Sequence, residues 1–278
     1  YQSDPLRANR NYSVIQMLDI YTKEQKQLTF KSKYFSPDIS DDGSEMIAVQ
    51  VNADGSNFLH RLNTNTGELI SQLPNTENYF FTQVKYVNNN EAVAAVRHVN
   101  GTMALVKIDI LTGALKPLMP FTYNVVGYPS VKNDTVFYTM MDAAKSLQPA
   151  DKIFAVNLKT FKNYQLTNNV NGIYQPIVNS KGDVLVSSFT AEGHRLQQFD
   201  AASLLWKELT TVTNLLVNPI GNVNSIQQKG ALALYSLKDT LLVAMPYKKS
   251  FQLFNFHSAR PIASDPEYGY SLYGNNIL

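Results

Sequence analysis

The chain has 278 residues, with 24 Lys and Arg against 22 Asp and Glu, a formal net charge of +2 and no cysteine. Because the basic residues are scattered singly instead of forming a stripe, the sequence argues against nucleic acid as a partner. The lack of cysteine excludes disulfides, thiolate nucleophiles and Cys-ligated metal centres. No apolar run approaches the ~18 residues of a membrane-spanning helix, so the chain itself is not expected to span a membrane.

A short apolar segment that ends in Asp or Asn and a turn recurs six times along the chain. The anchors of these turns are Asp19, Asn63, Asp109, Asn157, Asp200 and Asn255, separated by 44, 46, 48, 43 and 55 positions. The turn glycines Gly67 and Gly113 keep the same spacing of 46 positions. A unit of about 45 residues holds four short strands, so the period is typical of a propeller blade.

A second set of polar turns keeps the same period and leads into apolar or alternating runs. These turns lie at Gly43, Asn90, Asp134, Gly182 and Asp239. We expect a strand to begin just after each of them, because Asp, Asn and Gly favour tight reversals between strands. The acidic stretch with Asp38, Asp41 and Asp42 is accordingly interpreted as a structural turn, and a calcium site is the alternative that remains open.

The sequence therefore predicts an all-β fold, a β-propeller of four-stranded antiparallel blades. Six blades are expected, and five or seven are the alternatives. We expect the propeller to cover residues 1–258 and residues 259–278 to form a tail that leads to a following region. The chain opens YQSDPLRANR, with neither an initiator Met nor a signal-peptide pattern, and is interpreted as a piece of a longer protein.

One repeat carries a family resemblance. The stretch QLTFKSKYFSPDISDDGSEMIAV resembles the repeat of TolB-type β-propellers, with Leu28-Thr29, Tyr34, Ser36-Pro37, Ser40 and Asp42-Gly43 at the typical places. Two later repeats, GYPSV and IYQPIVNSKGD, keep an aromatic residue and the proline. The resemblance implies a binding scaffold of the bacterial cell envelope, periplasmic or associated with the outer membrane. The tail bears a weaker likeness to the start of an outer-membrane-associated β-domain.

The same resemblance raises an enzymatic alternative, because oligogalacturonate lyases share the fold and bind a divalent metal through channel histidines. The four histidines of this chain, His60, His98, His194 and His257, fall at different places in their repeats. We therefore expect them at the surface or in turns, and expect no metal and no cofactor. The sequence also lacks a Gly-x-Ser-x-Gly elbow, a His-Glu-x-x-His site and a Gly-rich phosphate loop. The chain is not expected to be an enzyme.

Two segments that break the period are the preferred binding surface, since insertions in repeat folds emerge as loops on one face. One is 141–152, with Lys145 and room for one turn of helix. The other, 210–230, is unusually apolar for a loop. Aromatic residues near the blade entrances, such as Tyr79, Tyr123, Tyr128 and Tyr174, are assigned to packing first and to ligand contact second. The candidate binding residues are Leu215, Leu216, Val217, Ile220, Tyr123 and Lys145.

The predicted function is a non-catalytic module that binds another protein or a neighbouring domain of a longer parent chain, with carbohydrate or peptide as further possible ligands. The alternative is a carbohydrate-active or peptidase-associated propeller. The sequence does not identify the ligand, because a propeller carries its function in loops on a common scaffold.

Overall fold

The structure is a computed structural model of the chain, and it describes residues 2–3, 11–142, 150–169, 171–210, 256–264 and 267–274. The chain divides into two compact units, Tyr1–Asn222 and Val223–Leu278. The described residues form β-strands and one short 3-10 helix, as the sequence predicts for an all-β fold. Among them no helix is long and apolar enough to cross a membrane.

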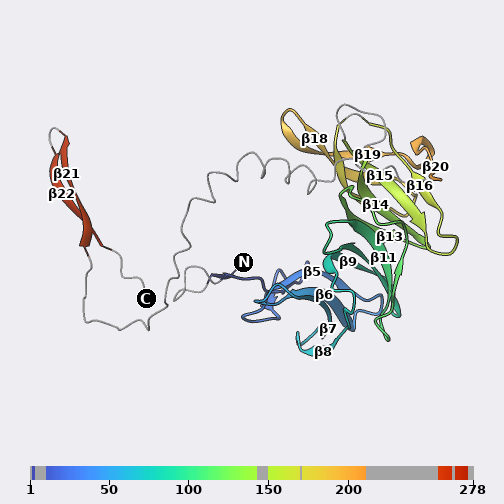
Figure 1. Cartoon of the computed structure of the whole chain (residues 1–278), viewed down its shortest axis with the longest axis horizontal. Helices are drawn as coiled ribbons and strands as arrows, with labels where there is room; N and C mark the ends of the chain where they lie inside the picture. Colours follow the sequence, from blue (N-terminus) through green and yellow to red (C-terminus); the bar gives the residue numbers. More distant parts are fainter. Residues whose placement is uncertain are drawn as a thin grey trace, which may run out of the picture. The chain divides into compact units, whose positions relative to one another are not determined.

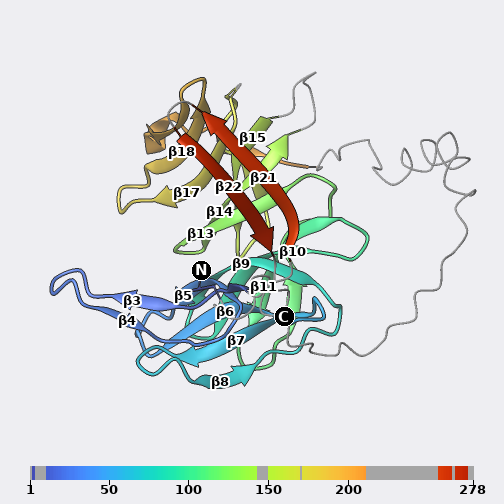
Figure 2. The ribbon, with the colours of Figure 1, turned by 90° about the vertical axis from the view of Figure 1, so that its left-hand side faces the viewer.

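The first unit consists of antiparallel sheets whose strands follow the order of the sequence (Figures 1 and 2). The first sheet has β5 (Tyr34–Ile39), β6 (Glu45–Val51), β7 (Asn57–Asn63) and β8 (Leu69–Gln72). The second sheet has β9 (Phe80–Asn88), β10 (Glu91–Arg97), β11 (Met103–Asp109) and β12 (Leu115–Pro117). The third sheet has β13 (Val126–Lys132), β14 (Thr135–Asp142), β15 (Ala150–Asn157) and β16 (Asn163–Gln165).

The fourth sheet has β17 (Ile173–Val178), β18 (Val184–Thr190) and β19 (Gly193–Phe199). Two short pairs precede the first sheet, β1 (Gln2–Ser3) with β2 (Asn11–Tyr12) and β3 (Gln16–Leu18) with β4 (Gln25–Gln27). The first strands of the four sheets, β5, β9, β13 and β17, contact one another in that order. This arrangement is that of neighbouring propeller blades, and the number of six blades stays a prediction.

Strands begin directly after four of the five predicted polar turns. β6, β10, β14 and β18 start one or two residues beyond Gly43, Asn90, Asp134 and Gly182. The fifth turn, at Asp239, lies outside the described residues. Of the segment 141–152, where one turn of helix is expected, both ends belong to β14 and β15, and residues 143–149 lie outside the described residues. The second set of repeat landmarks therefore correctly marks the second strand of each described blade.

Four of the six predicted anchors cap their turns in the same way. The side-chain Oδ1 atom of each accepts backbone N–H groups two and three residues ahead, at 2.8–3.0 Å, in Asp19, Asn63, Asp109 and Asn157. The residue four positions ahead has a positive φ in every case: Lys23, Gly67, Gly113 and Phe161. The spacing of the anchors in the sequence is thus the spacing of one kind of capped turn, which recurs along the chain. Asn255 lies outside the described residues.

The fifth anchor, Asp200, departs from this pattern. It makes no side-chain capping bond, it precedes a 3-10 helix at Ala201–Ser203, and Leu204 has a φ of −74°. The chain then adds β20 (Lys207–Glu208) to the outer edge of the third sheet, beside β16. The fourth sheet accordingly has three strands among the described residues, where the repeat predicts four.

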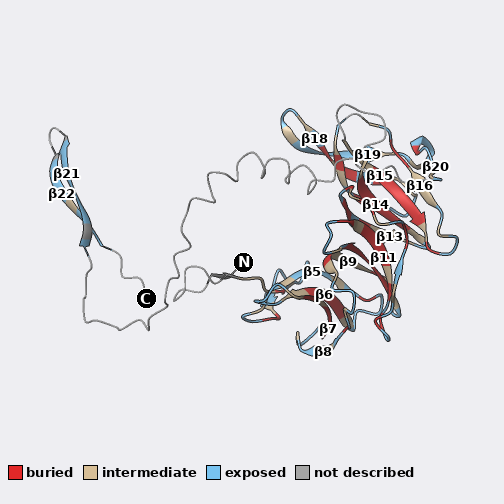
Figure 3. Ribbon diagram, in the orientation of Figure 1, coloured by how far each residue is buried: buried red, intermediate tan, exposed pale blue. Residues whose placement is uncertain are grey.

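The core lies between neighbouring sheets (Figure 3). In β10, Ala92 and Ala94 pack toward the first sheet, whereas Val93 and Ala95 pack toward the third. Successive side chains of a strand point to opposite faces, so a strand covered on both sides must be apolar at every position. This requirement explains the uninterrupted apolar run of β10, in which all of these residues are fully buried.

The described part of the second unit is a hairpin of β21 (Phe256–Ser264) and β22 (Glu267–Gly274). β21 begins at residue 256 and ends at residue 264, so it includes residue 258, where the sequence analysis expects the propeller to end. The predicted domain limits, 1–258 and 259–278, stay predictions.

Candidate functional site

The first strands of three sheets carry the same irregularity. A register shift in β5, β13 and β17 falls on the dipeptides Ser36-Pro37, Tyr128-Pro129 and Gln175-Pro176. The residue before each proline has a positive φ, of 49°, 53° and 56° respectively. A bulge of this kind bends the strand and redirects its side chains, and bulges are common beside functional sites. Tyr128 and Gln175 both line the hollows described next.

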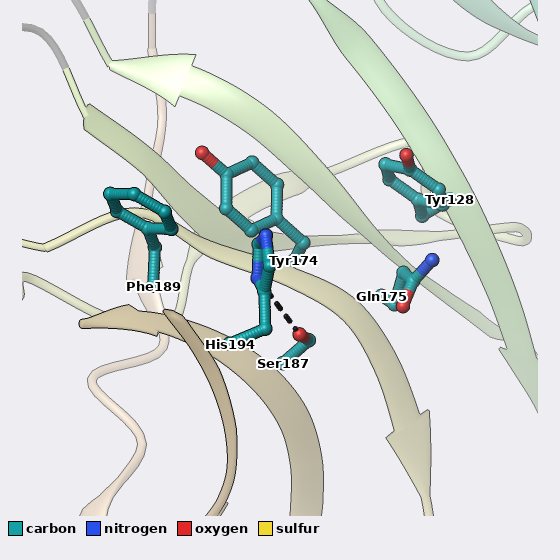
Figure 4. Close-up of a pocket in the computed structure, with 6 residues that line it drawn as sticks. All are labelled: Tyr128, Tyr174, Gln175, Ser187, Phe189 and His194. Atoms are coloured by element: carbon teal, nitrogen blue, oxygen red, sulfur yellow. Dashed lines mark hydrogen bonds between the residues drawn. The ribbon is translucent and has the colours of Figure 1, made fainter. Parts of the chain in front are cut away.

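The mouth hollow, of about 500 Å³, is lined by Tyr128, Tyr174, Gln175, Ser187, Phe189 and His194 (Figure 4). The His194 ring stands edge-on between two aromatic rings, 5.9 Å from Tyr174 and 5.3 Å from Phe189. Its Nδ1 atom lies 3.3 Å from the Ser187 hydroxyl. Phe189 is 54% exposed and Tyr128 is 40% exposed, so the hollow offers aromatic surface to a ligand.

The channel hollow, of about 580 Å³, is built from the first strands of all four sheets. It shares Tyr128 and Gln175 with the mouth hollow, so the two hollows adjoin at these residues. Its wall contains the ion pair of Asp38 on β5 with Lys85 on β9, at 2.7 Å. The second carboxylate oxygen of Asp38 accepts the backbone N–H of Tyr86 at 2.8 Å. The interpretation of Asp38 as part of a turn is therefore wrong, because it joins two sheets from within a strand.

Asp42 does belong to the predicted turn. One of its carboxylate oxygens accepts the N–H and the hydroxyl of Ser44 and the hydroxyl of Ser40. These bonds, above all the one from the Ser44 N–H, hold the pKa of Asp42 below its usual value. Asp41 lies beside it in the same turn and is exposed.

Hydrogen bonds between sheets also hold the first strands at the channel. The Gln83 side-chain oxygen accepts the backbone N–H of Tyr128 at 2.6 Å, which joins the second sheet to the third. A Cβ atom at Gly127 would lie 2.9 Å from that same oxygen, so a larger residue there would require the Gln83 side chain to shift. The backbone N–H of Gln175 donates to the Thr139 hydroxyl at 3.3 Å, which joins the third sheet to the fourth. These bonds fix the positions of β13 and β17, which line both hollows.

A carboxylate stands behind the mouth hollow. The Tyr174 hydroxyl donates to Asp151 on β15, and burial raises the pKa of Asp151 while this hydrogen bond lowers it. Burial, followed by the negative charge of Asp151, raises the pKa of Tyr174. Both effects keep the Tyr174 hydroxyl protonated.

Most of the binding residues predicted from the sequence lie outside the described residues: Leu215, Leu216, Val217, Ile220 and Lys145. Tyr123 is described, half-buried in the connection between β12 and β13, and it lines neither the mouth hollow nor the channel hollow. Sequence reasoning assigned Tyr128 and Tyr174 to packing first. The sequence feature that could have indicated these two tyrosines as lining residues is the proline one or two positions later, at the bulge of the first strand.

Of the three histidines whose side chains are described, only His60 departs from the predicted surface or turn position, because His98 opens a turn and His194 is exposed. His60 is buried, and its two ring nitrogens lie 2.9 Å from the Tyr34 hydroxyl and 2.9 Å from the Gln72 side-chain oxygen. His98 directly follows β10, and His194 lies in the mouth hollow. His257 lies in β21, and its side chain is outside the described residues. Within the described ranges, no group of three or more His, Asp and Glu side chains could hold a metal ion.

The fold is that of a β-propeller, and it is similar to the fold of TolB proteins among the solved structures. A putative TolB from Agrobacterium tumefaciens matches 71% of this chain and 69% of its own length, with a TM-score of 0.58 and 11% identity. TolB from Acinetobacter baumannii matches 72% of this chain and 50% of its own length, with a TM-score of 0.53 and 12% identity. The TolB-like propeller expected from the sequence is thus confirmed as the fold.

Peptidases share the fold as well. A puromycin-hydrolyzing peptidase from Mycobacterium tuberculosis matches 71% of this chain but only 32% of its own length, with a TM-score of 0.50 and 11% identity. The chain therefore spans about a third of that peptidase and half of the Acinetobacter TolB. Neither a family model nor a curated protein matches the sequence.

Proposed function

We propose that the chain is a non-catalytic binding module that takes an extended polypeptide segment of a partner protein, or of a neighbouring domain of its parent chain, at the mouth hollow. The observation that carries this proposal is the lining of the hollow, where three aromatic rings stand beside an amide, a hydroxyl and an imidazole. Aromatic rings bind side chains of a peptide, while Gln175 and Ser187 provide donors and acceptors for its backbone. The adjoining channel hollow offers further surface to a segment that extends past Tyr128 and Gln175.

The Ser187–His194 pair is the feature that most favours an enzyme instead. Activation of a serine requires the second ring nitrogen of the histidine to be oriented by a third group, and the reaction requires donors for the oxyanion. Among the described residues, His194 hydrogen-bonds to Ser187 alone, at a long 3.3 Å. A binding role for the pair, without catalysis, is therefore the proposal.

The resemblance of the repeat around Ser36-Pro37 to TolB-type propellers supports a location in the bacterial periplasm or at the outer membrane. The similarity to TolB structures supports the same assignment through the fold. Both are arguments from likeness. The location is a proposal that localisation of the tagged full-length protein tests directly.

Selection of peptides from a displayed random library on the wild-type chain tests the binding function. Affinities of the selected synthetic peptides are then measured by calorimetry for wild type, Tyr128→Ala and Phe189→Ala. We expect each substitution to weaken binding about tenfold or more, because aromatic side chains dominate peptide affinity. Leu69→Ala, which truncates an exposed side chain on β8, is the matched control and is expected to leave the affinity unchanged.

Equal affinity for all of these variants would contradict the mouth hollow as the site. If no peptide binds and an oligosaccharide array yields a ligand sensitive to the same substitutions, the ligand is a carbohydrate, and the polypeptide part of the proposal fails.

A further inference from the structure

A third hollow, of about 400 Å³, lies between the first and second sheets. It is bounded by the turns at Gly55 and Gly101 and by the connection between β8 and β9. The side chains that line it include those of Asn78, Tyr79, Phe80, Arg97, His98 and Val99. None of them lines the mouth hollow or the channel hollow, so this Arg97 hollow is a separate surface.

The Arg97 side chain carries the positive charge of this hollow. It pairs across the strands with Phe80, and its guanidinium carbon lies 5.3 Å from the centre of that ring. In the part of the chain that the structure describes, it forms no ion pair, whereas other basic residues of the same two sheets do, as in Arg61–Glu45 and Lys107–Glu91. Stacking on Phe80 restricts the guanidinium group and leaves its N–H donors available.

The neighbouring groups add donors and a rigid apolar wall. His98 accepts the backbone N–H of Asn100 at Nδ1, at 3.3 Å, so a neutral His98 carries its proton on Nε2 and donates from there. The Tyr79 backbone is held by Asn75 through two hydrogen bonds, of 2.9 and 2.7 Å. The Tyr79 ring packs on Phe121, with centroids 5.6 Å apart. Val99 is 73% exposed beside these donors.

We propose that the Arg97 hollow binds a carboxylate attached to an apolar side chain, as a polypeptide presents it at an apolar C-terminus or at an acidic residue beside an apolar one. Guanidinium binds carboxylate through two parallel hydrogen bonds, which a neutral amide does not reproduce. The apolar part of the ligand packs on Phe80, Tyr79 and Val99. This site is independent of the proposed function at the mouth hollow.

One nearby charge opposes the ligand. Glu77 stands close enough to Tyr79 that its negative charge, after burial, raises the pKa of that phenol. A bound carboxylate must therefore overcome repulsion from Glu77. Removal of that charge should strengthen binding, which a site without charge recognition would not show.

The probes are three short peptides, acetyl-Leu-Phe with a free C-terminus, the same peptide as its C-terminal amide, and acetyl-Glu-Phe amide. We expect the free acid or the Glu peptide to bind the full chain in the NMR-titratable millimolar range, and the neutral amide to bind about tenfold more weakly, as the loss of a charged hydrogen bond predicts. The carboxylate-bearing peptide that binds more tightly identifies the source of the carboxylate.

The variants are Arg97→Gln, Arg97→Lys, Glu77→Gln and, as a control, Arg195→Gln, which removes an exposed arginine paired with Glu192. We expect Arg97→Gln to lose about tenfold in affinity, Arg97→Lys to lose less, and Glu77→Gln to gain severalfold, all with unchanged circular dichroism. Arg195→Gln should bind like wild type. Equal binding of the acid and amide peptides, no effect of Arg97→Gln, or no binding by any peptide would overturn the proposal.

Discussion

The carboxylate of Asp38 on β5 joins the first sheet to the second through Lys85 Nζ at 2.7 Å and the backbone N–H of Tyr86 at 2.8 Å. Asp38→Ala leaves the Tyr86 N–H without its acceptor in a largely buried position. We expect the free energy of unfolding to fall by about 1–3 kcal/mol, the scale for an unpaired buried donor. Urea denaturation measures the change.

Lys85→Gln is the matched comparison. It removes the partially exposed ion pair but keeps the Asp38 bond to Tyr86, so we expect a loss of no more than about 1 kcal/mol. If both substitutions destabilise the chain equally, the ion pair and not the backbone bond holds the two sheets together.

Gly127 offers a second test, at the junction of the second and third sheets. An alanine Cβ would lie 2.9 Å from the Gln83 side-chain oxygen, which must then move away from the Tyr128 N–H. Because this oxygen ends a flexible side chain, we expect Gly127→Ala to destabilise the chain by no more than about 1 kcal/mol, the scale of one lost hydrogen bond, and to weaken binding at the mouth hollow. In a double-mutant cycle with Gln83→Ala the two effects should be less than additive. Strict additivity would show that the clash lies elsewhere.

The repeat period was readable from the sequence because it reports turn chemistry. Asn63 and Asp109 each cap a turn through the same two hydrogen bonds. Each such turn therefore requires Asn or Asp at its first position, and these residues recur in the sequence at the spacing of the turns. The apolar run of β10 was equally readable, because burial on both faces leaves no position for a polar side chain.

The candidate site was much less predictable. Tyr128 and Phe81 are both aromatic residues of first strands, yet Phe81 is buried at 1% exposure and Tyr128 is 40% exposed. Both strands have a register shift beside the aromatic residue, but only Tyr128 has a positive φ and donates its N–H to Gln83 of the neighbouring sheet, 45 positions away in the chain. Such contacts between sheets carry no local sequence signal. The predicted loop residues, including Leu215 and Lys145, lie outside the described residues and stay predictions.

The anchors allow a comparison within one chain. Asn63→Ala removes two hydrogen bonds to the turn, of 2.9 and 3.0 Å, whereas the Asp200 side chain makes no such capping bond. We expect Asn63→Ala to lower the free energy of unfolding by about 1–2 kcal/mol. Asp200→Ala should change it by no more than about 0.5 kcal/mol, as for a surface substitution. Equal effects in urea denaturation would contradict the assignment of the anchors to turn capping.

His60 predicts how stability depends on pH. It is buried between the Tyr34 hydroxyl and the Gln72 side chain, and burial lowers its pKa from the usual 6.5, an effect that the Gln72 bond opposes. The unfolded chain therefore takes up a proton at His60 at a higher pH than the folded chain does. The stability that neutral His60 contributes is complete above the unfolded pKa and is lost as the pH falls below it toward the lowered folded pKa.

We therefore expect the melting temperature of the wild-type chain to fall more steeply between about pH 7 and pH 5 than that of His60→Gln, which has no proton to gain at this position. Gln keeps a polar side chain near Tyr34 and Gln72, so the comparison concerns the slope with pH and is insensitive to a constant loss of stability. Leu69→Ala, which truncates an exposed side chain and removes no titratable group, is the control and should keep the wild-type slope. Parallel melting curves for wild type and His60→Gln would show that His60 titrates alike in the folded and unfolded chain, contrary to its buried position between the two hydrogen-bond partners.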